Sequence, residues 1–381
     1  MTTRSREVAL RLVEQSNIIE VEPMDEAHAV ALLEKKLGMD DRTDIAELAS
    51  ALEFMPLAIV QAAAYISQRA PRCSVQVYLE ELRKSDRKTT SLLNHEGGHL
   101  RRDWEAKNSI IVTWQISFDR ICEIRPSAAD LLSLMSFFDR QGIPEALLRS
   151  RIEPRNSRQD QEERNDDNSG EDNDEDDTSQ SSVSDGFEDD VLALRHYSFI
   201  SINTDGTTFE MHRLVQLATR KWLQDHGKQE KWKRQFIRNL DAELPTGEYE
   251  NWGRCQVLFP HAKSAATQQP EEQGLLRDWA SILYKAAWYA WKLGNGVEAE
   301  KMSIQAMKVR KRMLGREHDD TLDSMAMVGF AYTLRGRWDE AEKLEVEVME
   351  TSKTKLGVDH LDTLTSMANL ASTYRNQGRW D

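Results

Sequence analysis

The chain has 381 residues, of which 39% are hydrophobic and 30% are charged, a composition typical of a chain that folds only in part. Its formal net charge is −15, but the segment from Glu153 to Asp190 alone holds 16 acidic residues and 3 arginines, so the remainder is nearly neutral and lacks the clustered positive charge that nucleic acids and anionic lipids require. No apolar run approaches the roughly 20 residues of a membrane span, the first residues hold no signal-peptide pattern, and the three cysteines lie far apart, which predicts a soluble, reduced, cytoplasmic protein.

The first 65 residues have a pattern of short strands alternating with helices. Thr2–Ala9 has the character of a strand end followed by a polar turn and a helix start, and Ile18–Val21 predicts a short strand. Asp25 is placed to cap the amphipathic helix that follows it. Within the helical run Ala46–Tyr65, Pro56 must end one helix and start the next, because proline does not fit a helix interior.

The segment His95–His99 matches the His-Glu-x-x-His pattern of zinc metallopeptidases, in which Glu96 would polarise a metal-bound water. The two central glycines would cost about 2 kcal/mol inside a helix. Arg102 and Glu105 also stand where variants of the motif need Gly and His. We therefore favour a linker with chance histidines and no metal site, and keep the metallopeptidase as a remote alternative.

A second group of elements follows a basic, tryptophan-containing linker. Ala128–Leu148 predicts a helix, and Val191–Tyr197 predicts a further short one. Phe199–Ile202 and Thr208–Met211 predict two strands joined by a glycine-containing turn, and His212–Leu223 predicts an amphipathic helix. Helices followed by a hairpin and another helix are typical of a winged helix.

The acidic tract that interrupts this group, residues 153–189, has too few apolar side chains to bury a core and predicts a disordered insertion. An EF-hand loop is excluded, because Gly170 comes one position early and no helices flank the loop. Ser169 and Ser182, each three residues before an acid, match only a weak phosphoacceptor pattern.

The C-terminal end repeats itself at an offset of 42 residues, since 12 of 22 positions are identical between residues 318–339 and 360–381. Apolar residues fall at helical spacing in each half of a unit, and Gly336 and Gly378 lie between the halves. A fixed period of this length indicates a solenoid of helical hairpins. The pattern resembles tetratricopeptide repeats of the kinesin-light-chain-like kind. The array stops within a unit, so we expect it to be truncated.

The N-terminal and winged-helix elements together resemble the back half of an NB-ARC module of the STAND class, as in fungal NOD-like receptors. Thr2–Ser5 resembles the sensor segment of that family, and Pro56–Ala58 its Gly-Leu-Pro-Leu-Ala motif, with Phe54 and Met55 in place of Gly-Leu. Met211–Arg213 lies where the family has Met-His-Asp.

The resemblance implies that Arg4, Pro56 and His212 contact nucleotide, His212 near the β-phosphate. The alternative for His212 is a residue that caps its own helix. The chain has no Gly-x-x-x-x-Gly-Lys-[Ser/Thr] phosphate loop, so we expect no ATP hydrolysis and no cofactor here, with ADP or ATP bound only in an intact parent protein.

The sequence thus predicts a mostly α chain that acts as a non-enzymatic STAND-type signalling or scaffold protein. Its repeats are expected to bind a protein or peptide through Asn369, Ser372 and Asn376, which share a polar helix face, and self-association is a second class of partner. A kinesin-light-chain-like cargo adaptor is the alternative. The expected parts are an NB-ARC remnant (1–99), a winged-helix-like domain (100–152 and 190–228), the acidic insertion (153–189), a helical linker (229–278) and the repeats (279–381).

Overall fold

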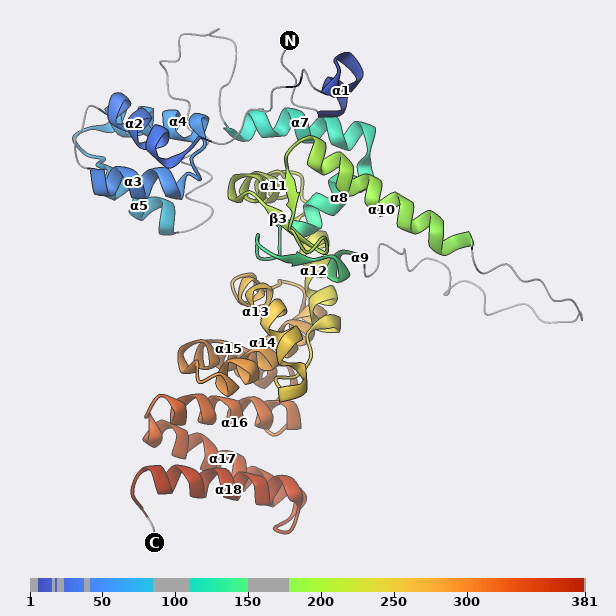
Figure 1. Cartoon of the computed structure of the whole chain (residues 1–381). Coiled ribbons are helices and arrows are strands. Elements are labelled where there is room, and N and C mark those ends of the chain that lie inside the picture. Colours follow the sequence, from blue (N-terminus) through green and yellow to red (C-terminus); the bar gives the residue numbers. More distant parts are fainter. Residues whose placement is uncertain are drawn as a thin grey trace, which may run out of the picture. The chain divides into compact units, whose positions relative to one another are not determined.

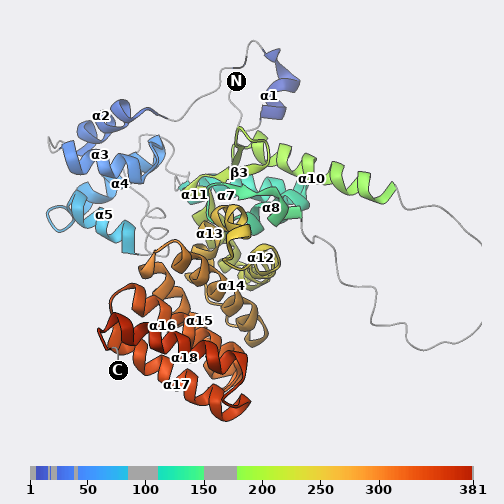
Figure 2. The same cartoon turned by 60° about the horizontal axis from the view of Figure 1, so that its bottom comes forward.

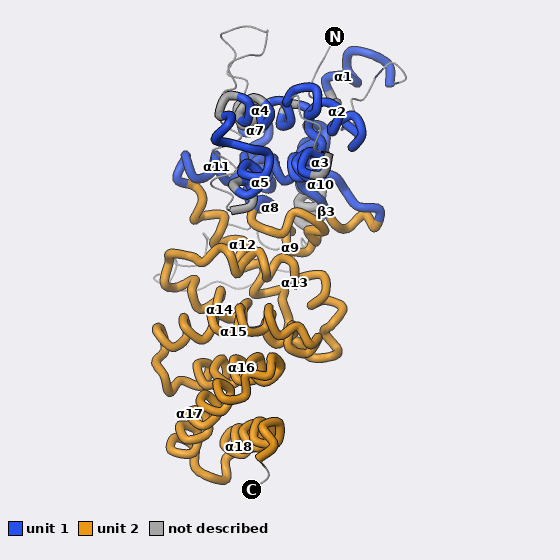
Figure 3. Tube along the Cα trace, turned by 90° about the vertical axis from the view of Figure 1, so that its left-hand side faces the viewer, with its two compact units in different colours: residues 1–136, 161–204, 209–227 blue, residues 137–160, 205–208, 228–381 orange. Residues whose placement is uncertain are grey.

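The computed structural model describes residues 6–15, 18, 24–37, 42–84, 110–149 and 178–379, most of which are helical (Figure 1). Among them, no helix combines the length and the apolar character that crossing a membrane takes. The chain divides into two compact units (Figure 3). Unit 1 takes its residues from 1–136, 161–204 and 209–227, and unit 2 from 137–160, 205–208 and 228–381.

Unit 1 begins with a cluster of short helices that follows the sequence pattern. These are α1 (Arg6–Leu12), α2 (Glu26–Leu37), α3 (Arg42–Ala51), α4 (Pro56–Arg69) and α5 (Val75–Lys84). Asp25 caps α2 as predicted, because its Oδ1 accepts from the backbone N–H of His28 at 2.8 Å. Pro56 opens α4, also as predicted. Leu33 and Leu48 are fully buried in the core of α2–α5.

The rest of unit 1 surrounds a β-hairpin. It comprises α7 (Ile110–Ile124), α8 (Pro126–Met135), α10 (Thr178–His196), β2 (Ile200–Ile202), β3 (Thr208–Met211) and α11 (Arg213–Asp225). The two strands pair antiparallel, with Ile200 opposite Met211. The turn between them is fixed by Asp205, whose Oδ1 accepts from the backbone N–H of Thr207 at 2.8 Å. The predicted hairpin and the helix after it are therefore confirmed.

The helix predicted for Ala128–Leu148 is not continuous. It ends with α8 at Met135, and the chain then forms a loop, the short strand β1 (Ile143–Pro144) and the helix α9 (Glu145–Arg149). Gly142 has φ +63°, a left-handed conformation that a helix cannot contain, and a proline follows it two residues later. The apolar pattern alone did not reveal this break.

The acidic tract is not disordered throughout, and this corrects the prediction for residues 153–189. Helix α10 includes the end of the tract as well as the short helix predicted at Val191–Tyr197, while the earlier part of the tract lies outside the described residues. Phe187 and Asp190 are buried. The Phe187 ring lies 6.2 Å from that of Phe209, so a single aromatic side chain anchors a stretch that is otherwise acidic.

Unit 2 opens with helices in the segment predicted to be a helical linker. They are α12 (Gln229–Glu243), the 3₁₀ turn η2 (Tyr249–Asn251) and α13 (Trp252–Ala266). His261 of α13 is fully buried, where its Nδ1 accepts from the backbone N–H of Asp139 at 3.1 Å and its Nε2 donates to the carbonyl of Gly142 at 3.2 Å. Burial lowers the pKa of His261 to about 4, so the ring is neutral at physiological pH.

Helical hairpins follow in chain order, as Figures 1 and 2 show. They are α14 (Gln273–Lys292) with α15 (Gly296–Leu314), and α16 (Asp319–Leu334) with α17 (Trp338–Leu356), followed by α18 (Leu361–Asn376). The array begins at Gln273, before the predicted start at Trp279. Gly336, at the turn after α16, has φ +72°, and the N–H of Arg337 closes the turn by donating to the carbonyl of Tyr332 at 2.9 Å.

The buried side of α18 differs from the apolar stripe that the sequence predicts. The predicted stripe holds Leu364, Met367, Ala368, Ala371 and Tyr374, whereas the buried residues are Thr363, Ser366, Leu370 and Thr373. Leu364 is 48% exposed, while Leu322, 42 residues earlier, is 6% exposed because it packs on Val348 of α17. Within the described residues, no later helix packs on Leu364 in the same way.

Candidate functional site

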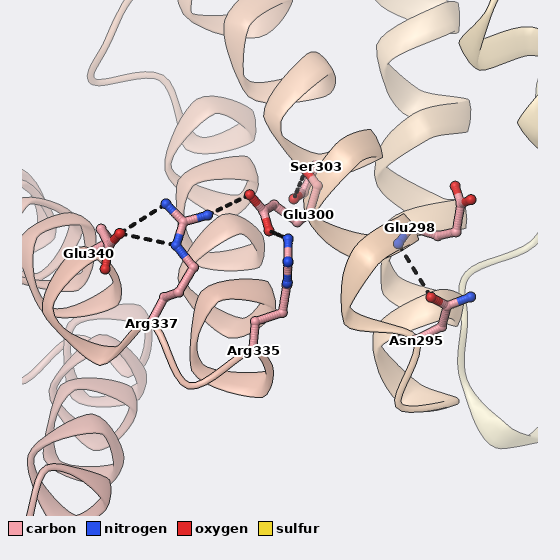
Figure 4. A network of polar contacts seen from close by, with 7 residues as sticks. All are labelled: Asn295, Glu298, Glu300, Ser303, Arg335, Arg337 and Glu340. Atoms are coloured by element: carbon pink, nitrogen blue, oxygen red, sulfur yellow. Dashed lines mark hydrogen bonds and ion pairs between the residues drawn. The ribbon is translucent and has the colours of Figure 1, made fainter.

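A cluster of charged side chains closes the joint between the first two hairpins. Glu300 of α15, whose side chain is 14% exposed, accepts hydrogen bonds from Arg335 and from Arg337, the latter at 2.6 Å (Figure 4). Arg337 also donates to Glu340 at 2.9 Å, which raises the pKa of Arg337, and its guanidinium lies 4.2 Å from the centre of the Tyr332 ring. We call the contact between Glu300 and Arg337 the inter-repeat clamp.

The clamp recurs at the next joint, 42 residues later. Arg379 donates to Glu342 at 2.9 Å and lies 4.3 Å from the centre of the Tyr374 ring. Hydrogen bonds from Gln377 and then Arg379 lower the pKa of Glu342. The first hairpin carries Asn295 where the later units have arginine, and the Asn295 side chain instead accepts from the N–H of Glu298 at 3.3 Å, which caps α15. The clamp therefore fixes each hairpin to the one before it, starting from the second.

The three residues predicted to bind a partner lie on one face of α18, apart from its buried side. Asn369 and Ser372 are half-buried, and Asn376 is exposed. At the same positions of the earlier first helices stand Lys285, Trp288 and Lys292 of α14, and Met327, Phe330 and Leu334 of α16. We call these nine positions the first-helix surface.

The chemistry of the first-helix surface changes along the array. On α14, Trp288 is half-buried, and its ring packs edge-on against Tyr284 with the ring centres 5.9 Å apart. On α16, the half-buried Phe330 stacks on Trp291 at 5.1 Å. The surface is thus aromatic on the first two helices and carries an amide, Asn369, on the third.

Sequence reasoning did not identify a charged cluster beside this surface. Arg310 of α15 donates to the carbonyl of Asp320 at 3.0 Å and to the hydroxyl of Ser324 at 3.1 Å, and its guanidinium lies 4.7 Å from the centre of the Tyr284 ring. Burial raises the pKa of Asp323 and raises that of Tyr284 to about 12. The one available signal was a departure from the repeat, since Ser352 occupies the position of Arg310 in the next unit.

His212 begins α11 and joins it to the α2–α5 cluster. Its Nδ1 accepts from the N–H of Leu214 at 3.1 Å, which confirms the capping alternative. Its Nε2 lies 2.7 Å from Oε2 of Glu53, and the same oxygen accepts from the N–H of Arg213 at 3.4 Å. Leu214 is buried in the core of α2–α5. These contacts involve His212 with a carboxylate of this chain.

The other residues assigned to nucleotide by resemblance are not brought together with His212. Pro56 is exposed at the first position of α4, and Arg4 lies outside the described residues. The segment His95–His99 also lies outside them. In the part of the chain that the structure describes, no group of three or more His, Cys, Asp or Glu side chains is placed to hold a metal ion.

Comparison with known families identifies the repeats. Residues 279–354 and 328–381 match a model of the tetratricopeptide repeat, so the array is a tetratricopeptide repeat array, as predicted. Residues 120–228, which include the hairpin and α11, match a model described as a domain of unknown function (DUF7779). The segment predicted to be winged-helix-like therefore corresponds to a recognised family.

One curated protein resembles the chain over most of its length. Over 337 residues, the chain is 32% identical to a nucleotide-binding leucine-rich repeat (NLR)-like protein of Hyaloscypha variabilis. The match covers 85% of this chain and 30% of that protein, so the chain spans about a third of the length of its relative. The resemblance to STAND proteins of the NOD-like-receptor type is confirmed, and the likeness supports a STAND-type protein-interaction scaffold over a kinesin-light-chain-like adaptor.

Proposed function

We propose that this chain is part of a non-enzymatic STAND-type protein whose repeats bind an extended protein or peptide ligand on the first-helix surface. The observation that carries the proposal is a tetratricopeptide array whose first helices keep aromatic and amide side chains half-exposed at the same positions. Core positions of such helices are apolar and buried, so side chains that stay accessible in register are suited to a partner.

The chemistry of the first-helix surface suits a peptide backbone with intervening side chains. The Asn369 amide both donates and accepts, so it can pair with both the N–H and the C=O groups of an extended chain. Trp288 and Phe330 offer rigid aromatic surface, which buries a large apolar area at a low cost in side-chain entropy. The inter-repeat clamp keeps the first helices at a constant spacing, and this limits the conformational cost of binding.

In this proposal, the nucleotide-dependent switch belongs only to an intact parent protein. The main phosphate contacts of such a switch come from a Gly-x-x-x-x-Gly-Lys-[Ser/Thr] loop, a motif that these 381 residues do not contain. ADP or ATP would therefore act on the repeats through elements that this chain contains only in part.

The test is selection of a displayed library of extended peptides against the whole chain, followed by affinity measurements on the best peptide. We expect Trp288→Ala and Asn369→Ala each to weaken binding by about tenfold, the loss typical of an interface anchor. Lys343→Ala is the control, because Lys343 is exposed on the second helix α17. If Lys343→Ala weakens binding as much as the other two substitutions, the first-helix surface is not the binding site.

A further inference from the structure

The end of α3 has an unusual backbone that places one side chain. The N–H of Phe54 donates to the carbonyl of Ala49 and the N–H of Glu53 to that of Ser50, at 3.0 and 2.9 Å. This pair of bonds defines a helix end whose left-handed residue is normally glycine. Here that residue is Glu53, with φ +52°, and Phe54 follows with φ +55°.

Glycine occupies the equivalent position elsewhere in the chain. After α16, the same pair of bonds closes around Gly336, which has φ +72°. A non-glycine residue held in the left-handed region indicates that the surrounding structure requires its side chain. At Glu53 that requirement is met by a contact with α11, a helix that begins about 160 residues later.

The contact between Glu53 and His212 has a defined hydrogen-bond direction. Because Nδ1 of His212 accepts from the N–H of Leu214, Nε2 carries the ring hydrogen and donates to Oε2 of Glu53 at 2.7 Å. Both side chains are mostly buried, at 27% and 19% exposed. Leu214, one turn into the same segment, adds an apolar contact with the α2–α5 core. Polar and apolar contacts thus converge on the first turn of α11.

We propose that Glu53 is a positioning residue, which holds His212 and the first turn of α11 against the α2–α5 cluster without nucleotide. The proposal rests on the STAND-type function proposed above, and it specifies the regulation of the His212 site. The carboxylate of this chain supplies the anionic contact that the family resemblance assigns to a phosphate. The joint between the helical cluster and α11 is then closed in the absence of ligand.

Hydrogen exchange of the whole chain, measured by mass spectrometry, tests this through effects that cross from one partner to the other. Glu53→Gly gives the end of α3 its preferred residue but removes the carboxylate, so residues 212–216 exchange about tenfold faster while residues 52–55 do not. His212→Asn keeps a good helix cap but loses the contact, so residues 52–55 exchange faster. Glu53→Gln keeps an acceptor oxygen and restores most of the protection.

Two controls make the outcome decisive. His28→Ala breaks a second His–carboxylate pair in the same cluster, with Asp25, whose side chains are exposed; it leaves both segments unchanged. Addition of ADP to the unmodified chain also leaves residues 212–216 unchanged, because His212 is already engaged. Effects confined to the substituted segment, or protection of residues 212–216 that depends on ADP, would overturn the proposal. Loss of peptide binding in Asn369→Ala is measured separately and tests only the proposed function.

Discussion

The repeat array and the region around the β-hairpin are stabilised by polar contacts of different kinds. In the array, the Glu–Arg contact at one joint is repeated at the next with the same separation of 37 residues in sequence. Around the hairpin, Arg125 contacts Asp190, 65 residues away, and Asp190 also accepts from the hydroxyl of Ser127 at 2.6 Å. The first kind of contact spreads the stabilisation over several joints, and the second concentrates it on one residue.

The largest effect that this comparison predicts comes from a contact of the second kind, at His261 in unit 2. Its pKa is about 4 when folded and about 6.5 when unfolded, so the unfolded chain binds more protons between these values. The contribution of His261 is therefore fully present above about pH 6.5 and decreases as pH falls towards 4, by about 3 kcal/mol in total. Urea unfolding at several pH values measures the loss.

The variant His261→Gln identifies the source of this acid sensitivity. Glutamine retains a donor and an acceptor but does not titrate, so the difference in stability between the two proteins should narrow as pH falls from 6.5 to 4. Parallel pH curves for the two proteins would assign the acid loss to carboxylates elsewhere.

The second prediction concerns Asp190, the other singular contact. Asp190→Ala leaves the guanidinium of Arg125 without its buried partner, so the free energy of unfolding should fall by about 2–3 kcal/mol. Asp189→Ala is the matched control, because the Asp189 side chain is 59% exposed and contacts the same arginine at 3.2 Å. We expect that control to cost less than about 0.5 kcal/mol in urea unfolding. Equal losses would mean that burial does not distinguish the two contacts.

The smallest expected effects are in the array. Glu300→Gln should destabilise the chain by about 1 kcal/mol, since it removes a charge from two hydrogen bonds to arginine at a mostly buried site. Glu342→Gln, at a site that is 26% exposed, should cost about half as much. Thermal unfolding of both variants, with the exposed Glu350→Gln as control, checks the order. A larger loss at Glu342 would contradict the view that burial sets the strength of the clamp.

The sequence was sufficient where structure depends on local or periodic patterns. The repeat, the hairpin at β2 and β3 and the caps at Asp25 and His212 all follow from residue types within a few positions, or from similarity 42 residues away. A local pattern also suffices for Pro56, because its ring excludes it from a helix interior wherever the rest of the chain lies.

The sequence was insufficient where one distant contact decides the outcome. Nothing near Asp190 marks it as buried, since its neighbours are acidic and its partner Arg125 precedes it by 65 residues. Glu53 lies in the left-handed region for a reason that appears only once α11 is in place. Leu364 has the same apolar pattern as Leu322 but not the same burial, because burial depends on a neighbouring helix. Residue type and spacing do not specify such partners.

The spacing of the inter-repeat clamp also bears on how such an array can change length in evolution. Each glutamate is followed by its arginine 37 residues later, and each such pair by the next after 42. An in-frame duplication of any 42-residue block within this register therefore yields a new unit whose glutamate and arginine already match both neighbours. An insertion of any other length separates the pair at one joint. The array can gain whole units without new compensating substitutions at the joints, so its number of units can vary more freely than the length of any one unit.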